Sequence, residues 1–369
     1  MYFILIMAKR SNTRRIYIGR IPVGGASPVT VQSMTNTDTR DSSATIRQIR
    51  KLAESGCDII RVAVPDIAAA GRLPEILEKS PIPVIADIHF DFKLALASID
   101  AGVAGIRINP GNIGDEKKVR AIAEAAGAKN IPIRVGANAG SLPREFLSKL
   151  GGKRPHDECR LAEALVKSAL NECRILEKFG FRDIKVSLKA SSVPVTVMAY
   201  RKFSGESDYP LHVGITEAGT LVRGTIKSAV GIGALLLDGI GDTIRVSLTA
   251  DPVEEVKTGI IILESAGLRK AEPELVSCPT CGRTEIDLMG LVHKVESEIE
   301  KIRKTGTRIK LKKLAVMGCV VNGPGEARDA DFGIAGAKKS RAAVFMKGRL
   351  KGIYSEAAAM EMLRIELEK

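Results

Sequence analysis

The stretch that decides the fold is VIADIHFDFKLALASIDAGVAGIRIN, residues 84–109. It begins with a short apolar run, passes through a polar loop, continues as an amphipathic helix and ends with a second apolar run. The same unit recurs from residue 29 to residue 266. Repetition of strand, loop and helix predicts an α/β fold with a parallel sheet.

Eight strands are predicted along this repeat. They are Val29–Gln32, Ile59–Val64, Val84–Ile88, Gly105–Asn109, Ile131–Val135, Ile184–Leu188, His212–Thr216 and Thr243–Leu248. The helices between them include Ala44–Ser55 and Leu161–Phe179. Eight β-α units in series predict a closed (β/α)8 TIM barrel, with residues 142–152 forming a lip over its mouth.

The chain of 369 residues exceeds what one core usually supports, so two domains are expected. We expect a substrate-binding barrel over residues 1–267, a linker over 268–277 and a small α+β domain over 278–369. The predicted elements of the α+β domain are a helix over 284–303, strands over 312–317, 332–335 and 342–346, and a helix from Ser355.

The composition is that of an ordinary soluble protein, with 45% hydrophobic and 27% charged residues. The apolar opening Met1–Met7 is far shorter than the roughly 20 residues of a membrane span, and Met7 is a candidate start. We therefore expect a cytoplasmic protein without a membrane segment.

The net charge of +13 predicts an anionic partner. Nucleic acid is disfavoured because the chain has no Trp, only 4% aromatic residues and no recognition-helix pattern. The densest basic run, residues 303–313, has two readings, a docking site for an acidic electron donor or a solvated face, and we favour the second.

Polar residues gather at the carboxyl ends of the predicted strands, where barrel enzymes place their chemistry. They include Asn36, Arg61, Asp87, His89, Arg107, Asn109, Arg134, Asn138, Lys189, Glu217, Arg245 and Ser247. Several pairs lie two residues apart and share a face of an extended strand. Guanidinium groups match phosphate oxygens two at a time, so this pattern predicts a diphosphate site. The alternative for each arginine is a structural ion pair.

Three side chains are candidates for moving protons or orienting substrate. His89 lies two residues from Asp87 at a strand end, whereas an isolated histidine is more often a core residue. Glu217 directly follows a strand and is the best barrel carboxylate for a general acid. Its protonation state stays open, because burial raises a carboxyl pKa while neighbouring cations lower it.

The three cysteines near the C-terminus have metal-ligand spacing. Cys278 and Cys281 form a C-x-x-C pair, and Cys319 begins CVVNGPGE, which ends in Glu326. Zinc is slightly favoured by the spacing alone, with the fourth ligand unidentified. An iron–sulfur cluster held by three thiolates and the Glu326 carboxylate is the alternative, and its displaceable oxygen ligand would suit catalysis.

The remaining cysteines, Cys57, Cys159 and Cys173, stand singly in apolar segments and are expected to be buried, inert thiols.

Both cysteine segments resemble those of the bacterial 4-hydroxy-3-methylbut-2-enyl diphosphate synthase family. The resemblance extends into the barrel through ADIHFD, RINPGN, RVGAN, SLKAS and GITEAG, which begin at residues 86, 107, 134, 187 and 214. It implies reductive ring opening and dehydroxylation of 2-C-methyl-D-erythritol 2,4-cyclodiphosphate by two electrons. The start Met1–Met7 departs from the family pattern and holds no candidate functional residue.

The resemblance also implies the roles of individual residues. A [4Fe–4S] cluster is expected on Cys278, Cys281, Cys319 and Glu326, and Glu217 is the expected barrel acid. The expected diphosphate ligands are Arg61, Arg107, Asn109, Arg134, Asn138, Lys189 and Ser247.

Electrons are expected from ferredoxin or flavodoxin, since the sequence has no nucleotide-binding fingerprint. The short linker and the family together imply a head-to-tail homodimer in which each cluster domain caps the partner's barrel. The competing enzyme class is a phosphate-binding barrel similar to pterin-binding synthases with a structural zinc lid. A basic nucleic-acid-binding protein with a zinc module leaves the converging barrel arginines unexplained.

Overall fold

The structure is a computed structural model that describes residues 12–142, 157–270, 273–305, 309–319, 325, 329–337 and 341–369. The chain divides into two compact units, residues 1–269 and residues 270–369. Each unit has its own hydrophobic core. Within the described ranges, no helix is both long enough and apolar enough to span a bilayer.

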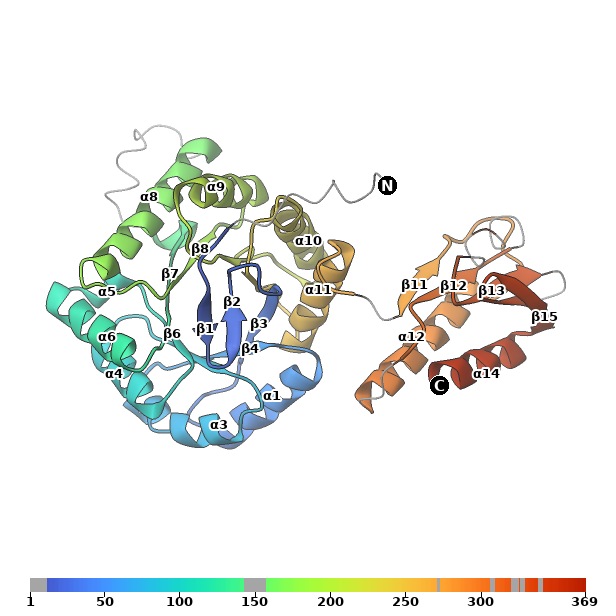
Figure 1. Cartoon of the computed structure of the whole chain (residues 1–369), viewed down its shortest axis with the longest axis horizontal. Helices are drawn as coiled ribbons and strands as arrows, with labels where there is room; N and C mark the ends of the chain where they lie inside the picture. Colours follow the sequence, from blue (N-terminus) through green and yellow to red (C-terminus); the bar gives the residue numbers. More distant parts are fainter. Residues whose placement is uncertain are drawn as a thin grey trace. The chain divides into compact units, whose positions relative to one another are not determined.

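The first unit is a barrel of eight parallel strands, as the sequence predicts (Figure 1). The strands are β3 (Thr30–Met34), β4 (Ile59–Ala63), β5 (Val84–Asp87), β6 (Gly105–Arg107), β7 (Ile133–Asn138), β8 (Ile184–Lys189), β9 (His212–Val213) and β10 (Thr243–Ile244). Their order in the sheet is β8-β7-β6-β5-β4-β3-β10-β9. A parallel bridge between Val186 and Leu211 joins β8 to the segment before β9 and closes the ring.

Helices surround the ring of strands (Figure 1). They are α1 (Ser42–Glu54), α2 (Ile67–Ala70), α3 (Leu73–Lys79), α4 (Phe92–Ala101), α5 (Pro110–Ile113), α6 (Glu116–Ala128), the 3-10 turn Ala139–Ser141, α8 (Glu158–Glu177), α9 (Val193–Glu206), α10 (Leu221–Leu237) and α11 (Pro252–Ser265). Many begin with an aspartate whose carboxylate accepts a backbone N–H of the first turn, as Asp41 and Asp251 do. The lip predicted over residues 142–152 lies outside the described residues after Leu142.

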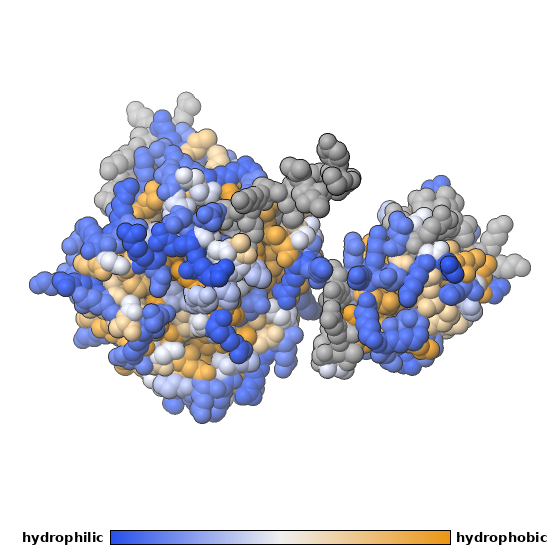
Figure 2. Space-filling model, viewed as in Figure 1, coloured by the Kyte–Doolittle hydropathy of each residue, from blue (hydrophilic) through white to orange (hydrophobic). Residues whose placement is uncertain are grey.

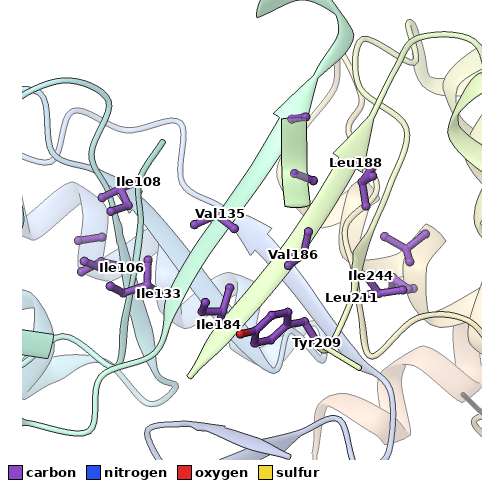
Figure 3. Close-up of a cluster of buried hydrophobic side chains, with 14 of the residues drawn as sticks. Ile106, Ile108, Ile133, Val135, Ile184, Val186, Leu188, Tyr209, Leu211 and Ile244 are labelled. Atoms are coloured by element: carbon purple, nitrogen blue, oxygen red, sulfur yellow. The ribbon is translucent and has the colours of Figure 1, made fainter. Parts of the chain in front are cut away.

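Alternation along the strands separates the barrel's apolar layer from its polar interior. Ile133, Val135, Ile184 and Val186 belong to the large core that the outer helices cover (Figure 3). The residues between them include Arg134 and Lys185, which are paired across β7 and β8. Because successive side chains of a strand point to opposite faces, the same strands build the core and bring charged groups inside the ring.

A hairpin that the sequence analysis did not predict closes the amino end of the barrel. It consists of β1 (Ile16–Ile18) and β2 (Ile21–Val23), which pair antiparallel. Its apolar residues pack with Ile59 and Ile85, near the starts of β4 and β5. The hairpin therefore forms an apolar floor, and the polar residues at the carboxyl ends of the strands lie at the other end.

The second unit is a five-stranded sheet with helices α12 and α14 packed in its core. Its elements are β11 (Glu274–Ser277), α12 (Leu288–Lys304), β12 (Lys313–Met317), β13 (Phe332–Ala337), β14 (Arg341–Met346), β15 (Arg349–Ser355) and α14 (Glu356–Leu367). Strands β11, β12 and β13 are parallel, and β14 and β15 continue the sheet antiparallel. Hydrophilic side chains cover much of the face drawn for each unit, with apolar patches between them (Figure 2).

The structure corrects three details of the predicted second unit. Residues 274–277, assigned to the linker, form β11 and pair in register with β12. Strand β15 was not predicted, because it is an exposed edge strand whose alternation is interrupted by a register shift opposite Val344 and Phe345. The predicted helix over 284–303 begins at Leu288, and the terminal helix begins directly after its capping residue Ser355.

Candidate functional site

The barrel places most of the predicted site residues at the carboxyl ends of its strands. Arg61, Asp87 and Arg107 lie on three neighbouring strands, β4, β5 and β6. Arg134 and Asn138 lie on β7, and Lys189 ends β8. His89, Asn109, Glu217 and Ser247 follow β5, β6, β9 and β10.

Asp87 is the centre of a buried ion-pair group. Its carboxylate lies 3.6 Å from Arg61 Nε, 3.3 Å from Arg107 Nη1 and 3.6 Å from His89 Nε2. Arg107 Nη1 also lies 3.2 Å from His89 Nδ1. Burial opposes ionisation of Asp87, but the Arg61 charge, the His89 hydrogen bond and Arg107 hold its pKa well below the usual range. Asp87 is therefore an ionised anchor for two guanidinium groups.

Arg134 is a buried guanidinium with incomplete partners. Its Nη2 donates to Ser187 Oγ at 2.8 Å, whereas Nε and Nη1 lack a partner among the described residues. Burial and the neighbouring charges of Arg61 and Arg107 lower its pKa well below the ordinary value. An unsatisfied, buried cation is costly unless an anion meets it.

The β8 face adds a buried basic group, Lys185, that the sequence analysis did not single out. Lys185, Ser187 and Lys189 alternate on β8, and Lys185 and Lys189 are both buried. Burial and nearby arginines lower the pKa of both lysines well below the usual value. Lys185 Nζ lies 3.5 Å from Gln32 Oε1. In Lys-Val-Ser-Leu-Lys, Lys185 and Lys189 are four residues apart, so both side chains point to the same face of the strand. This even spacing is the sequence signal that relates Lys185 to Lys189.

His212 and Gln32 complete this deeper polar layer. His212 is fully buried on β9, and neither ring nitrogen has a partner among the described residues. Burial and the charges of Arg134 and Lys189 lower its pKa well below the usual value, so the imidazole is neutral. His212 is the first residue of its strand, and the sequence gave no sign that its ring lies near these basic groups, because a strand's first residue can face inward.

The interior of the barrel therefore carries an excess of basic groups over carboxylates. The basic groups are Arg61, Arg107, Arg134, Lys185, Lys189 and Arg245. In the described residues, the ion pairs of this group are to Asp87 and Glu255, with Arg245 Nη2 3.8 Å from Glu255 Oε2. The arrangement suits a compact ligand with several negative charges, such as a diphosphate.

The remaining predicted residues form a more open rim. Asn109, Asn138 and Ser247 are half-buried, and Glu217 is exposed with a backbone φ of 51°. Their side chains do not join the hydrogen bonds of the Asp87 group within the part of the chain that the structure describes. A positive φ at a residue with a side chain is uncommon and often marks a functional position.

The two cysteine segments lie next to each other in the second unit. Gly318 N–H donates to Cys278 Sγ at 3.1 Å, and Glu285 N–H donates to Gly318 O at 2.8 Å. The Cys281 N–H donates to Thr284 Oγ1 at 3.1 Å. The backbone N–H of Arg283 lowers the pKa of the Cys281 thiol. Cys319, which directly follows Gly318 after β12, is therefore held beside the C-x-x-C turn.

The donor chemistry of these segments fits a thiolate-bound metal centre. Cys278, Cys281 and Cys319 are free, and backbone N–H groups lie beside Cys278 and Cys281. Glu326, the fourth predicted ligand, lies outside the described residues. Among the described residues, no three His, Cys, Asp or Glu side chains are already gathered in metal-binding geometry.

The fold and the two sites together define the class of protein. It is an α/β enzyme with a TIM barrel whose interior carries basic side chains, and a separate unit whose cysteines have metal-ligand spacing. The family model described as the GcpE TIM-barrel domain matches residues 13–260, and that described as the GcpE protein C-terminal domain matches residues 274–369. The chain belongs to the GcpE family.

Relatives with high identity confirm the resemblance found in the sequence. Over 360 residues, the chain is 55% identical to a 4-hydroxy-3-methylbut-2-en-1-yl diphosphate synthase (flavodoxin) of Caldanaerobacter subterraneus subsp. tengcongensis. It is 54% identical to the protein of the same name from Geobacter sulfurreducens. Both alignments cover 98% of this chain and 98% of the relative.

Among solved structures, the barrel is similar to the dihydropteroate synthase of Yersinia pestis. The comparison has a TM-score of 0.51 at 13% identity and covers 69% of this chain and 98% of that one. At such low identity the likeness shows a shared barrel fold and no shared activity.

Proposed function

We propose that this chain is a 4-hydroxy-3-methylbut-2-enyl diphosphate synthase. Its reaction is the reductive ring opening and dehydroxylation of 2-C-methyl-D-erythritol 2,4-cyclodiphosphate. Two electrons and one proton enter. The ring C–O bond to phosphate breaks and leaves an anionic phosphate oxygen, the hydroxyl takes the proton and leaves as water, and a C=C bond forms. The observation that carries the proposal is the buried excess of cations inside a barrel of this family.

The barrel cations would bind the substrate through its two phosphates. Arg61, Arg107, Arg134 and Lys189 supply charge, and Asn109, Asn138 and Ser247 supply hydrogen bonds at the rim. As the ring opens, the released phosphate oxygen gains negative charge that these preorganised donors neutralise. Arg134 Nε and Nη1 have free donor capacity for this role among the described residues.

Different roles follow for the three proton-transfer candidates. Asp87 is ionised and paired with Arg61 and Arg107, so it orients these guanidinium groups and does not donate a proton. His89 lies beside both Asp87 and Arg107 and is exposed to incoming substrate. Glu217 is the proposed acid for the departing hydroxyl, at the exposed turn after β9.

A [4Fe–4S] cluster on Cys278, Cys281, Cys319 and Glu326 would supply the two electrons one at a time. The closeness of Cys278 to the Gly318–Cys319 segment supports this ligand set. The chain's own contribution is to hold the thiolates in an environment of backbone N–H donors.

An acidic redox protein is the proposed electron donor. The relatives' names specify flavodoxin, and the net charge of +13 favours association with an acidic partner such as flavodoxin or ferredoxin. We further propose a cytoplasmic, head-to-tail homodimer in which the second unit of one protomer serves the barrel of its partner. Full activity from a strictly monomeric protein would contradict the dimer.

Anaerobic reconstitution with iron and sulfide tests the proposed function. The expected result is bound iron and acid-labile sulfide, and turnover of the cyclic diphosphate with a low-potential reductant. Zinc in place of iron in carefully air-excluded protein, together with no turnover, would instead support a phosphate-binding barrel with a structural zinc lid.

A further inference from the structure

Two outer helices, α8 and α11, each place a buried glutamate beside a segment that carries proposed diphosphate-binding residues. Glu172 lies on α8 and is 5% exposed, and Glu255 lies on α11 and is 6% exposed. Neither belongs to the predicted ligand set. Buried carboxylates are unusual unless they satisfy a specific partner, so the contacts of both residues call for a reason.

Glu172 completes the hydrogen bonding of β7 where its neighbour β6 ends. Ile133 N–H bonds to Asp183 O on the β8 side, so the N–H of Gly136, three residues on, points to the β6 side. Strand β6 ends at Arg107, which pairs with Arg134. Glu172 Oε2 accepts the Gly136 N–H at 2.7 Å instead. The segment held in this way runs from Arg134 to Asn138.

Gly136 lies where β7 packs tightly against β8. An added Cβ at Gly136 would lie 2.1 Å from Ser187 Oγ and 2.3 Å from Ser187 O, so β7 and β8 are in close contact here. The same Ser187 Oγ accepts from Arg134. The Glu172 hydrogen bond therefore supports the segment 134–138 beside Ser187, the residue that accepts a hydrogen bond from Arg134.

Glu255 accepts a backbone N–H of the segment after β10, as Glu172 does for β7. The backbone ladder between β10 and β3 ends with Ile244 paired to Val31. Beyond it, Glu255 Oε1 accepts the Leu248 N–H at 2.9 Å, and Oε2 lies 3.3 Å from Ser33 Oγ on β3. Oε2 is also 3.8 Å from Arg245 Nη2. Glu255 thus joins β3 to the segment that carries Arg245 and Ser247.

We propose that Glu172 and Glu255 are positioning residues for substrate, which hold the segments 134–138 and 245–248 in the geometry that binds the diphosphate. The inference rests on the proposed function. Each glutamate supplies a side-chain acceptor where the pairing with one neighbouring strand has ended. For Glu172 this is the β6 side of β7, and for Glu255 it is the segment after the paired part of β10 and β3. Neither residue is expected to touch the substrate.

The two glutamates differ in how much their charge matters. Burial raises the pKa of Glu172 to about 7, against the opposing Gly136 hydrogen bond. An uncharged acceptor is therefore an adequate replacement at this position. Glu255 also pairs with the Arg245 guanidinium, so there the charge contributes as well. Glutamine is expected to replace Glu172 fully and Glu255 in part.

The experiment compares acceptor and non-acceptor variants in the reconstituted full-length enzyme. Glu172→Leu is expected to raise KM for the cyclic diphosphate about tenfold, as for one lost buried hydrogen bond, with kcat changed less than about twofold. Glu172→Gln is expected to restore KM to near the wild-type value. Glu255→Leu is expected to raise KM likewise, and Glu255→Gln to recover part of the loss.

Asp58→Ala is the matched control. Asp58 also accepts a strand N–H, that of Val31 at 2.7 Å, but it precedes β4 at the amino end of the barrel. This variant is expected to lower the melting temperature and leave KM unchanged. Should Glu172→Leu not fold, Glu172→Asp makes the same comparison, because it keeps the charge and withdraws the acceptor by one methylene.

Two outcomes separate this inference from the proposed function. If Glu172→Leu, Glu255→Leu and Glu172→Asp have the wild-type KM and only a lowered melting temperature, the positioning role is overturned and the proposed function stays intact. A wild-type holoenzyme that neither binds nor converts the cyclic diphosphate would overturn both. A raised KM in Glu172→Leu that Glu172→Gln rescues supports the inference.

Discussion

The barrel mouth and the cysteine segments are built on different physical principles. The barrel site lies on strands whose register already places Arg61, Asp87 and Arg107 within ion-pair distance. The cysteine site lies in turns, and its described residues form no closed ligand group. A sheet therefore brings its charged side chains together without a ligand, whereas a metal centre in turns is completed by the metal itself.

The two sites also differ in how they affect the stability of the protein without its ligands. The barrel keeps buried cations with missing partners, which destabilises the free protein and favours anion binding. The thiols remain ordinary side chains until a metal binds them. Each of the following variants tests one side of this comparison.

The largest effect is expected for Cys319→Ser. Loss of one thiolate ligand should abolish both the colour of the reconstituted cluster and product formation. The measurement is the visible absorption spectrum and anaerobic turnover of the same sample. Cys159→Ser is the matched control and should retain both properties. Cys159 lies on α8 in the other unit and is exposed, so its predicted burial is wrong, whereas Cys57 and Cys173 are buried as predicted. Turnover retained in Cys319→Ser would refute the cluster assignment.

Glu326→Ala should separate cluster binding from reactivity. Three thiolates remain, so much of the colour is expected to persist, while turnover falls severely because the displaceable ligand is gone. Iron content and single-turnover rate measure the two effects. A turnover rate equal to that of the wild type would remove Glu326 from the proposed mechanism.

Arg134→Met should weaken substrate binding and stabilise the ligand-free barrel. Affinity for the cyclic diphosphate is expected to fall by about 2 to 4 kcal/mol. The free energy of unfolding is expected to rise by roughly 1 to 3 kcal/mol, because an incompletely paired buried charge is replaced by an apolar side chain. Calorimetry and urea unfolding measure the two. A variant that loses stability together with affinity would contradict the view of a barrel strained by its own cations.

Asp87→Asn should give the smallest effect, a pH-dependent loss of stability. The pKa of Asp87 is lowered in the folded state, so its contribution is fully present above the usual carboxyl pKa, 3.8, and is lost as the pH falls toward the folded value. The variant is expected to be roughly 2 kcal/mol less stable near neutral pH. Urea unfolding from neutral pH to below pH 4 should show this difference shrinking, and a constant difference would contradict the ion-pair role.

Sequence patterns predicted the elements whose periodicity is strong. All eight barrel strands were found, because β-branched runs between amphipathic helices have few alternatives. The hairpin Ile16–Val23 escaped prediction because each of its strands has only three residues. Strand β11 was read as linker because it is only partly buried at the start of the second unit's sheet.

The site was predictable where the residue type itself carries the chemistry. Cysteines at ligand spacing and arginines at strand ends could be found in one dimension. Lys185, His212, Glu172 and Glu255 could not, because their importance depends on which neighbours lie across the ring or behind a strand. Only contacts between distant segments distinguish them from ordinary core or helix residues.

The sequence alone determined the repeated strand-helix unit, the family resemblance and the chemical types of the ligands, because these depend on local periodicity and on side-chain identity. Tertiary structure decided that Asp87 is an ionised anchor, that Arg134 lacks partners and that two outer glutamates complete the strands. These properties arise from burial and from distances between segments far apart in the chain, which no local pattern encodes.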